Sequence, residues 1–311
     1  LADGVYDLTF YFVEPEGLAP GEREFDVLAQ DEVLIHALDI SRSRSSAEAS
    51  ALKRTVTGVH VVDGRLSIAL RSRKASPVIS ALTVRSRTVD PAQWRLLWSD
   101  EFDYQGAPDK TRWVIDQWPA RKVNDEDQAY TARSRNVRVE DGRLILEAHR
   151  ETFDDAEYTS GRIHGHGLGD VLYGRVDIRA KLPSGQGLWS ALWMLPSDPY
   201  RYATTCVDES DWQGNAACDA WPNSGEIDIM EHVGYDMRRV HSTVHTRRFF
   251  SSGPDLRNAS VEIDDVSGDF HVYSLVWTPT LISVLVDGVE FYRYLKLDND
   301  WEYWPFDQPF H

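Results

Sequence analysis

Several features are scarce in this sequence, and each scarcity excludes a class of protein. Two cysteines among 311 residues are too few for a disulfide framework that replaces a hydrophobic core. Apolar runs fall short of the roughly 18–20 residues that a membrane-spanning helix needs. No long segment repeats its apolar residues with a helical period, which excludes a helix bundle. Positive charge is also in deficit, because a net charge of -17 opposes binding to nucleic acid or to an anionic membrane.

The sequence consists instead of many short segments of alternating or apolar residues, separated by turn-forming residues. This pattern predicts an all-β protein, a β-sandwich or jelly roll. Asp63-Gly64 is a typical two-residue hairpin turn, so it is expected to join two paired strands. A linker over residues 86–93 divides the chain, which predicts two β domains, at residues 1–88 and 94–311.

The most informative segment is residues 225–231, where the sequence GEIDIME places three acids among apolar residues. Charged groups are rarely buried unless paired, so three carboxylates in a segment typical of a buried strand need an explanation. Alternation along a strand puts Glu226 and Asp228 on one face and Glu231 on the other. A single β-bulge near residues 229–230 would return Glu231 to the face of the other two.

Three acids on one wall of a cleft would repel one another, which raises some pKa values and keeps one acid protonated near neutral pH. A protonated acid beside an ionised one is what retaining glycoside hydrolysis requires, with the carboxyls roughly 5–5.5 Å apart. The alternative is an edge strand whose acids face water. The interleaved apolar residues Ile227, Ile229 and Met230 favour the site.

Histidines, cysteines and tryptophans each leave two interpretations open. His241 and His245 have the spacing of zinc ligands on a helix, but on a strand they lie about 13 Å apart, so no zinc site is predicted. His245 can hydrogen-bond with the acids from a neighbouring strand or have a structural role. Cys206 and Cys218 can form a disulfide, which their spacing does not decide. The 11 tryptophans fit both core packing and a groove that stacks on sugar rings.

Residues 94–311 resemble glycoside hydrolase family 16, and within it the bacterial laminarinases, which are endo-β-1,3-glucanases. The resemblance is carried, in the family's order, by WSDEF at 98–102, YTSGR at 158–162, GLWSALWML at 187–195, WPNSGEIDIMEHVG at 221–234, VHSTVH at 240–245 and WPFDQPF at 304–310. It implies a concanavalin A-like β-jelly-roll sandwich with a concave substrate groove. It also implies retaining endo-hydrolysis of β-1,3-glucosidic bonds in laminarin-type β-glucans.

The resemblance assigns roles to residues at matching positions. Glu226 matches the nucleophile and Glu231 the general acid/base, and Asp228 between them is expected to tune both. The positions that match substrate-binding residues are Trp189, Trp193, Trp221, Arg162, Asn136 and His245. Trp193 has core packing as an alternative, because it lies further along its strand than Trp189.

The same resemblance bears on cofactors and partners. No redox cofactor or catalytic metal is required, and a structural calcium ion is predicted to bind through Glu101. We expect a monomer whose partner is a β-glucan polysaccharide, without nucleic-acid or membrane partners. A secreted, periplasmic or cell-surface location is expected, although the chain carries no signal peptide.

Residues 1–85 resemble the later half of a malectin-type carbohydrate-binding domain. This second resemblance is carried by YDLTFYF at 6–12, REFDV at 23–27, VVDGRL at 61–66 and PVISA at 77–81. It implies a sugar-binding β-sandwich fragment, and the alternative is a β-sandwich spacer without a ligand.

Both resemblances predict that strands of the two families are missing at the ends of this chain. Missing strands would expose unpaired edges and apolar core faces. One alternative function is hydrolysis of mixed-linkage β-glucan or of a marine galactan, since the whole family shares the acid motif. The other is a non-catalytic glycan-binding protein, if the truncation abolishes activity.

Overall fold

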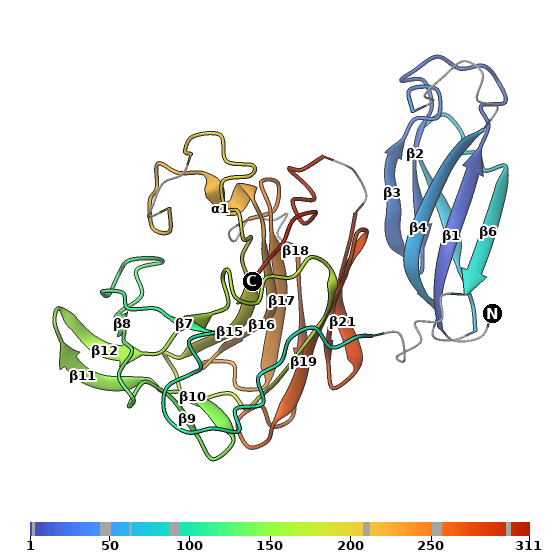
Figure 1. Ribbon diagram of the computed structural model, residues 1–311. Helices are drawn as coiled ribbons and strands as arrows, with labels where there is room; N and C mark the ends of the chain where they lie inside the picture. Colours follow the sequence, from blue (N-terminus) through green and yellow to red (C-terminus); the bar gives the residue numbers. More distant parts are fainter. Residues whose placement is uncertain are drawn as a thin grey trace. The chain divides into compact units, whose positions relative to one another are not determined.

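The computed structural model is almost entirely β, which confirms the all-β prediction (Figure 1). It describes residues 1, 4–43, 51–61, 64–86, 94–207, 212–250, 257–296 and 300–311. The chain divides into two compact units, formed chiefly by residues 1–94 and by residues 95–311. None of the helices in these described ranges has the length and apolar character that crossing a membrane demands.

The first unit is built from two three-stranded antiparallel sheets that share an apolar core. Its strands are β1 (Gly4–Phe12), β2 (Glu24–Ala29), β3 (Glu32–Leu38), β4 (Leu52–Val61), β5 (Ile68–Lys74) and β6 (Ala81–Ser86). The sheet orders are β4-β1-β6 and β3-β2-β5. Leu8, Phe10 and Phe12 of β1 are buried at every second position, because side chains alternate along a strand. Phe12 meets Phe25 of β2 edge to face, with ring centroids 5.8 Å apart.

The predicted hairpin at Asp63-Gly64 is wrong. Strand β4 pairs with β1, whereas β5 pairs with β2 in the other sheet. The chain therefore crosses from one sheet to the other here, and Asp63 itself lies outside the described residues. A turn-forming dipeptide favours a tight reversal, but the buried faces of the strands decide which partners pair.

The second unit packs two four-stranded antiparallel sheets against each other, with smaller sheets beside them (Figure 1). Its elements are β7 (Val114–Ile115), β8 (Gln128–Tyr130), β9 (Val137–Glu140), β10 (Arg143–Leu146), β11 (His149–Phe153), β12 (Ala156–Ser160), β13 (Ile163–His164), β14 (Gly174–Ala180), β15 (Trp189–Met194), α1 (Ala220–Asn223), β16 (Glu226–Val233), β17 (Arg239–His245), β18 (Arg257–Glu262), β19 (His271–Thr278), β20 (Leu281–Val286) and β21 (Val289–Leu295). The larger sheets have the orders β14-β19-β20-β21 and β15-β16-β17-β18. Ile227 of β16 and Leu275 and Trp277 of β19 are buried, so β16 turns its apolar face to the core.

The segment at residues 300–311 packs aromatic side chains beside the start of β16. Its buried rings are Trp304, Phe306 and Phe310. A methyl group at Gly225 would lie 2.8 Å from Pro305 Cγ and 3.0 Å from Phe306 Cε1, so only glycine fits there. This packing surrounds Gly225, the residue immediately before β16 begins at Glu226.

Candidate active site

A β-bulge in β16 brings the three acids to one face of the sheet. The consecutive pairs between β15 and β16 are Leu192 with Met230 and Trp193 with Asp228. Ile229 is therefore an extra residue, and the register against β17 shifts over the same stretch. An extra residue reverses the alternation beyond it, so Glu231 returns to the face of Glu226 and Asp228. The bulge predicted near residues 229–230 is confirmed.

Two exposed tryptophans hydrogen-bond with the outer acids. Trp221, which precedes β16, donates its indole N–H to Glu226 Oε2. Trp189 of β15 donates its indole N–H to Glu231 Oε1 at 3.0 Å. Their side chains remain 38% and 60% exposed, so each indole can both orient a carboxylate and offer a face to a sugar ring.

The central acid, Asp228, is held from both neighbouring strands. His245 of β17 lies with Nε2 3.1 Å from Asp228 Oδ2, within ion-pair distance but without the geometry of a hydrogen bond, so a hydrogen bond from His245 to the acids stays a prediction. Ser242, also of β17, donates its hydroxyl to the backbone carbonyl of Asp228 at 2.7 Å. Trp193 pairs with Asp228 from β15 and is half-buried. The zinc site was rejected on the expectation that residues 241–245 form a strand. They do form one, as part of β17.

Burial and mutual repulsion raise the pKa values of two of the acids. Burial is the main cause for Glu226, and repulsion from Asp228 raises the pKa of Glu226 further. His245 and the N–H of Trp221 act in the opposite direction on the same pKa. Burial also raises the pKa of Asp228, with added repulsion from Glu231, against a hydrogen bond with Glu226 that lowers it. Ionisation of Glu226 and Asp228 is therefore mutually opposed, as expected for like charges that are buried side by side.

Arg162 lies between two indole rings beside this cluster. Its guanidinium carbon is 4.2 Å from the ring centroid of Trp118 and 4.8 Å from that of Trp193. Its Nε pairs with Asp116 Oδ2 at 2.9 Å. Because Trp193 pairs with Asp228, the stacked Arg162 adjoins the acids. Trp118 and Asp116 were missed by sequence reasoning, since they lie far from the motif along the chain and no local pattern connects them to it.

Asn136 is not part of this surface, and its predicted contact with substrate is corrected. Its side chain is fully buried. The amide nitrogen donates to the Glu147 carbonyl and to Thr159 Oγ1, each at 3.0 Å. The amide oxygen accepts from Thr131 and Arg133. All of its hydrogen-bonding capacity holds loops together, so Asn136 is a structural residue.

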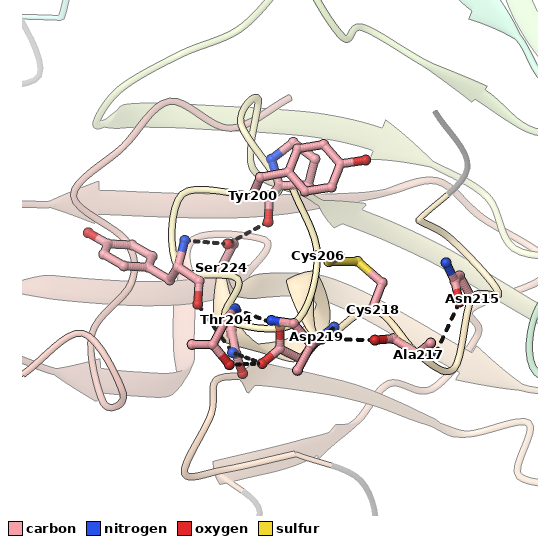
Figure 2. The surroundings of a disulfide bond; sticks show 12 residues. Tyr200, Thr204, Cys206, Asn215, Ala217, Cys218, Asp219 and Ser224 are labelled. Carbon is pink, nitrogen blue, oxygen red and sulfur yellow. Dashed lines mark hydrogen bonds between the residues drawn. A yellow bond between two sulfur atoms is a disulfide. The ribbon is translucent and has the colours of Figure 1, made fainter. Parts of the chain in front are cut away.

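An insertion between β15 and β16 leads directly into the acids. Cys206 and Cys218 form a disulfide in it, with their Cα atoms 5.0 Å apart, which answers the question that spacing left open (Figure 2). Asp219 follows the second cysteine and accepts several hydrogen bonds from the start of the insertion. The insertion ends in the short helical turn α1, which carries Trp221. Sequence reasoning missed Asp219, because its partners are distant along the chain.

Glu101, predicted to bind a calcium ion, does not belong to a cluster of metal-binding side chains in the part of the chain that the structure describes. Glu101 is exposed. Among the described residues, no group of three or more His, Cys, Asp or Glu side chains could hold a metal ion. The neighbouring Asp100 is already engaged by Tyr104 and Trp113, each at 2.9 Å. A calcium ion bound through Glu101 stays a prediction.

Comparison with known proteins places this geometry in a family. Residues 124–311 match glycosyl hydrolases family 16, and residues 1–87 match the malectin domain. The β-glucanase of Rhodothermus marinus is 44% identical over 224 residues, which cover 70% of this chain and 73% of that protein. Glucan endo-1,3-β-glucosidase A1 of Niallia circulans is 36% identical over 252 residues, 71% of this chain and 34% of that protein.

A solved structure gives the same result. The X-ray structure of the laminarinase from Rhodothermus marinus has a TM-score of 0.61 and 43% identity, covering 70% of this chain and 83% of that one. The predicted β-jelly-roll sandwich and both predicted resemblances are thereby confirmed. The chain belongs to glycosyl hydrolases family 16.

Proposed function

We propose that this chain is a retaining endo-β-1,3-glucanase that hydrolyses laminarin-type β-glucans. Its similarity to a β-glucanase, an endo-1,3-β-glucosidase and a laminarinase supports this substrate class. One structural observation carries the chemistry. The bulge in β16 puts Glu231 on the face of Glu226, with Asp228 between them.

In the proposed first step, the protonated carboxyl of Glu231 donates its proton to the glycosidic oxygen as the bond to the anomeric carbon breaks. The Glu226 carboxylate attacks that carbon, which forms a glycosyl-enzyme ester. In the second step, Glu231 takes a proton from water, and the water oxygen displaces Glu226 from the anomeric carbon. Asp228 tunes both neighbours through charge. No cofactor enters either step.

The residues proposed to bind substrate differ in how exposed their side chains are. Trp189 and Trp221 present open indole faces, which supports a role as platforms for sugar rings. Trp193 and Arg162 form a stacked wall next to the acids. His245 is proposed to tune the acid cluster through Asp228.

Further proposals concern the rest of the chain. Residues 1–88 are proposed as a carbohydrate-binding unit, supported by the malectin match, and residues 94–311 as the hydrolase. The disulfide supports a location outside the cytoplasm, since such bonds persist in oxidising compartments. The net charge of -17 supports a protein without nucleic-acid or anionic-membrane partners, and a monomer is proposed.

The first experiment measures reducing-end release from laminarin, with lichenan and agarose in parallel. Release from laminarin above the other two is expected. Faster release from lichenan would identify a mixed-linkage glucanase, and release from agarose a galactanase. Glycan binding without release from any of them would favour the binding-protein alternative.

The variant Glu226→Gln tests the nucleophile. It should abolish release and keep laminarin binding, because shape is preserved while the nucleophilic charge is lost. Glu262→Gln is a matched control, since Glu262 lies in the same sheet and pairs with Arg239 at an exposed position. Full activity of Glu226→Gln would exclude Glu226 as the nucleophile.

A further inference from the structure

Asp219 joins two distant parts of the insertion that precedes β16 (Figure 2). Its Oδ1 accepts hydrogen bonds from the backbone N–H groups of Thr204 at 2.7 Å and Thr205 at 2.9 Å. Its Oδ2 accepts from the Thr204 hydroxyl and from Asn223 Nδ2, the latter at 2.9 Å. Burial opposes ionisation of Asp219, yet the bonds from Thr204 and Thr205 outweigh it and hold its pKa well below the usual value. The carboxylate is therefore ionised and its hydrogen bonds are charge-assisted.

The disulfide closes the same piece of chain. Thr205, next to Cys206, donates its hydroxyl to the Ala217 carbonyl at 2.9 Å. The Asp219 N–H donates in turn to the Thr205 hydroxyl at 3.0 Å. The two ends of the loop are thus tied by one covalent bond and by hydrogen bonds on either side of it, which fixes the backbone at Asp219.

Trp221 lies between two members of this network. Asp219 precedes it by two residues, and Asn223 follows it by two. Arg247, which follows β17, approaches both: its Nη1 lies 3.5 Å from Asp219 Oδ2 and donates to Asn223 Oδ1 at 3.4 Å. Because the chain is anchored on both sides of Trp221, the indole is held where its N–H reaches Glu226.

We propose that Asp219 is a positioning residue for hydrolysis, which anchors the segment that carries Trp221 and so sustains the hydrogen bond from Trp221 to Glu226. This inference rests on the proposed role of Glu226 as nucleophile. Asp219 acts through Trp221, and the disulfide supports it by closing the loop.

The pH dependence of activity separates positioning from folding. The Trp221 N–H lowers the pKa of Glu226, which burial and Asp228 raise. When the anchoring segment loosens, this bond weakens and the pKa of Glu226 rises. Only the ionised carboxylate attacks, so the acid limb of the pH–rate profile moves to higher pH. A role confined to stability would lower the amount of folded enzyme without moving that limb.

The test compares kcat/KM on laminarin across pH for the wild type and Asp219→Ala. On the acid limb, kcat/KM of the variant should be about 10-fold lower than that of the wild type, which is the size of effect expected for a lost hydrogen bond to a charged acceptor. The matched control is Asp287→Ala, because Asp287 also accepts from a backbone N–H, that of Val272, and from a side chain, His271. It lies at the β20–β21 turn and should leave the limb in place.

A second variant keeps the test valid if Asp219→Ala folds poorly. Asp219→Asn preserves shape and the acceptor, but it turns an NH₂ group toward the donors of Thr204 and Asn223. It should move the acid limb in the same direction by a smaller amount. An unmoved limb in both variants would overturn the proposal.

Two further measurements decide how Asp219 acts. In a Trp221→Phe background, Asp219→Ala should cause no additional displacement of the limb, and an additive displacement would contradict action through Trp221. Carbon-13 NMR titration of the Glu226 carboxyl needs no turnover, so it applies even if the wild type releases no sugar and the proposed function fails. A higher pKa in Asp219→Ala supports positioning, and an equal pKa refutes it.

Discussion

Substitution of Gly225 by alanine should destabilise the second unit strongly. Gly225 has φ +91°, a conformation that costs a non-glycine residue about 1–3 kcal/mol. The added Cβ would meet Pro305 Cγ at 2.8 Å and Phe306 Cε1 at 3.0 Å, and Phe306 is fully buried. Overpacking of this kind costs about 1–3 kcal/mol more. The sum, about 2–6 kcal/mol, corresponds to a fall of roughly 4–24 °C in Tm for a unit of this size.

Differential scanning calorimetry with a matched control tests this reasoning. Gly142 also has a positive φ, +71°, but a Cβ there would meet nothing within 4 Å. Gly142→Ala should therefore lose only the backbone contribution, about 1–3 kcal/mol. The difference between the two variants isolates the contact with the aromatic segment. Equal losses in both would refute the argument that residues 300–311 leave no room for a side chain at Gly225.

Three other outcomes are expected. Glu226→Gln should raise the free energy of unfolding at pH 7 by about 1 kcal/mol, measured with urea. The pKa of Glu226 is raised in the folded state, so the stability that Glu226 contributes is present below its unfolded-state pKa and is lost as pH rises through its folded-state pKa. Glutamine does not ionise and therefore avoids this loss. The stability difference between Glu226→Gln and the wild type should vanish in acid. Trp189→Phe should lower kcat/KM on laminarin about 10-fold in initial-rate assays, since the ring stays but the N–H donor to Glu231 is lost. Replacing Cys206 and Cys218 by serine should lower the free energy of unfolding by about 2–3 kcal/mol in urea titrations, because the disulfide closes a loop with a sequence separation of 12.

The acid cluster could be predicted because it depends on residues that lie close together along the chain. The spacing of Glu226, Asp228 and Glu231 along one strand, together with the apolar residues between them, required a bulge near residues 229–230. A bulge changes the alternation within one strand, so the sequence of that strand contains the information. The motifs around Trp189 and Trp221 added the neighbours of the outer acids.

Other predictions depended on contacts between distant segments, and these were less secure. Asn136 matched a substrate-binding position, yet its side chain is buried and fully hydrogen-bonded. Asp63-Gly64 is typical of a hairpin, but β4 and β5 pair in different sheets. Both outcomes follow from which elements pack together, and the local residue types do not specify that.

By itself the sequence determined the β class, through its alternating segments, and pointed to the chemistry of the site, through three acids placed among the apolar residues of one strand. Tertiary structure alone decided which groups surround those acids. Trp118 stacks on Arg162, Asp116 pairs with it, and Asp219 anchors the segment that precedes Glu226. The physical reason is range: alternation and turn chemistry act between near neighbours in the chain, whereas packing and hydrogen bonds select partners by proximity in space.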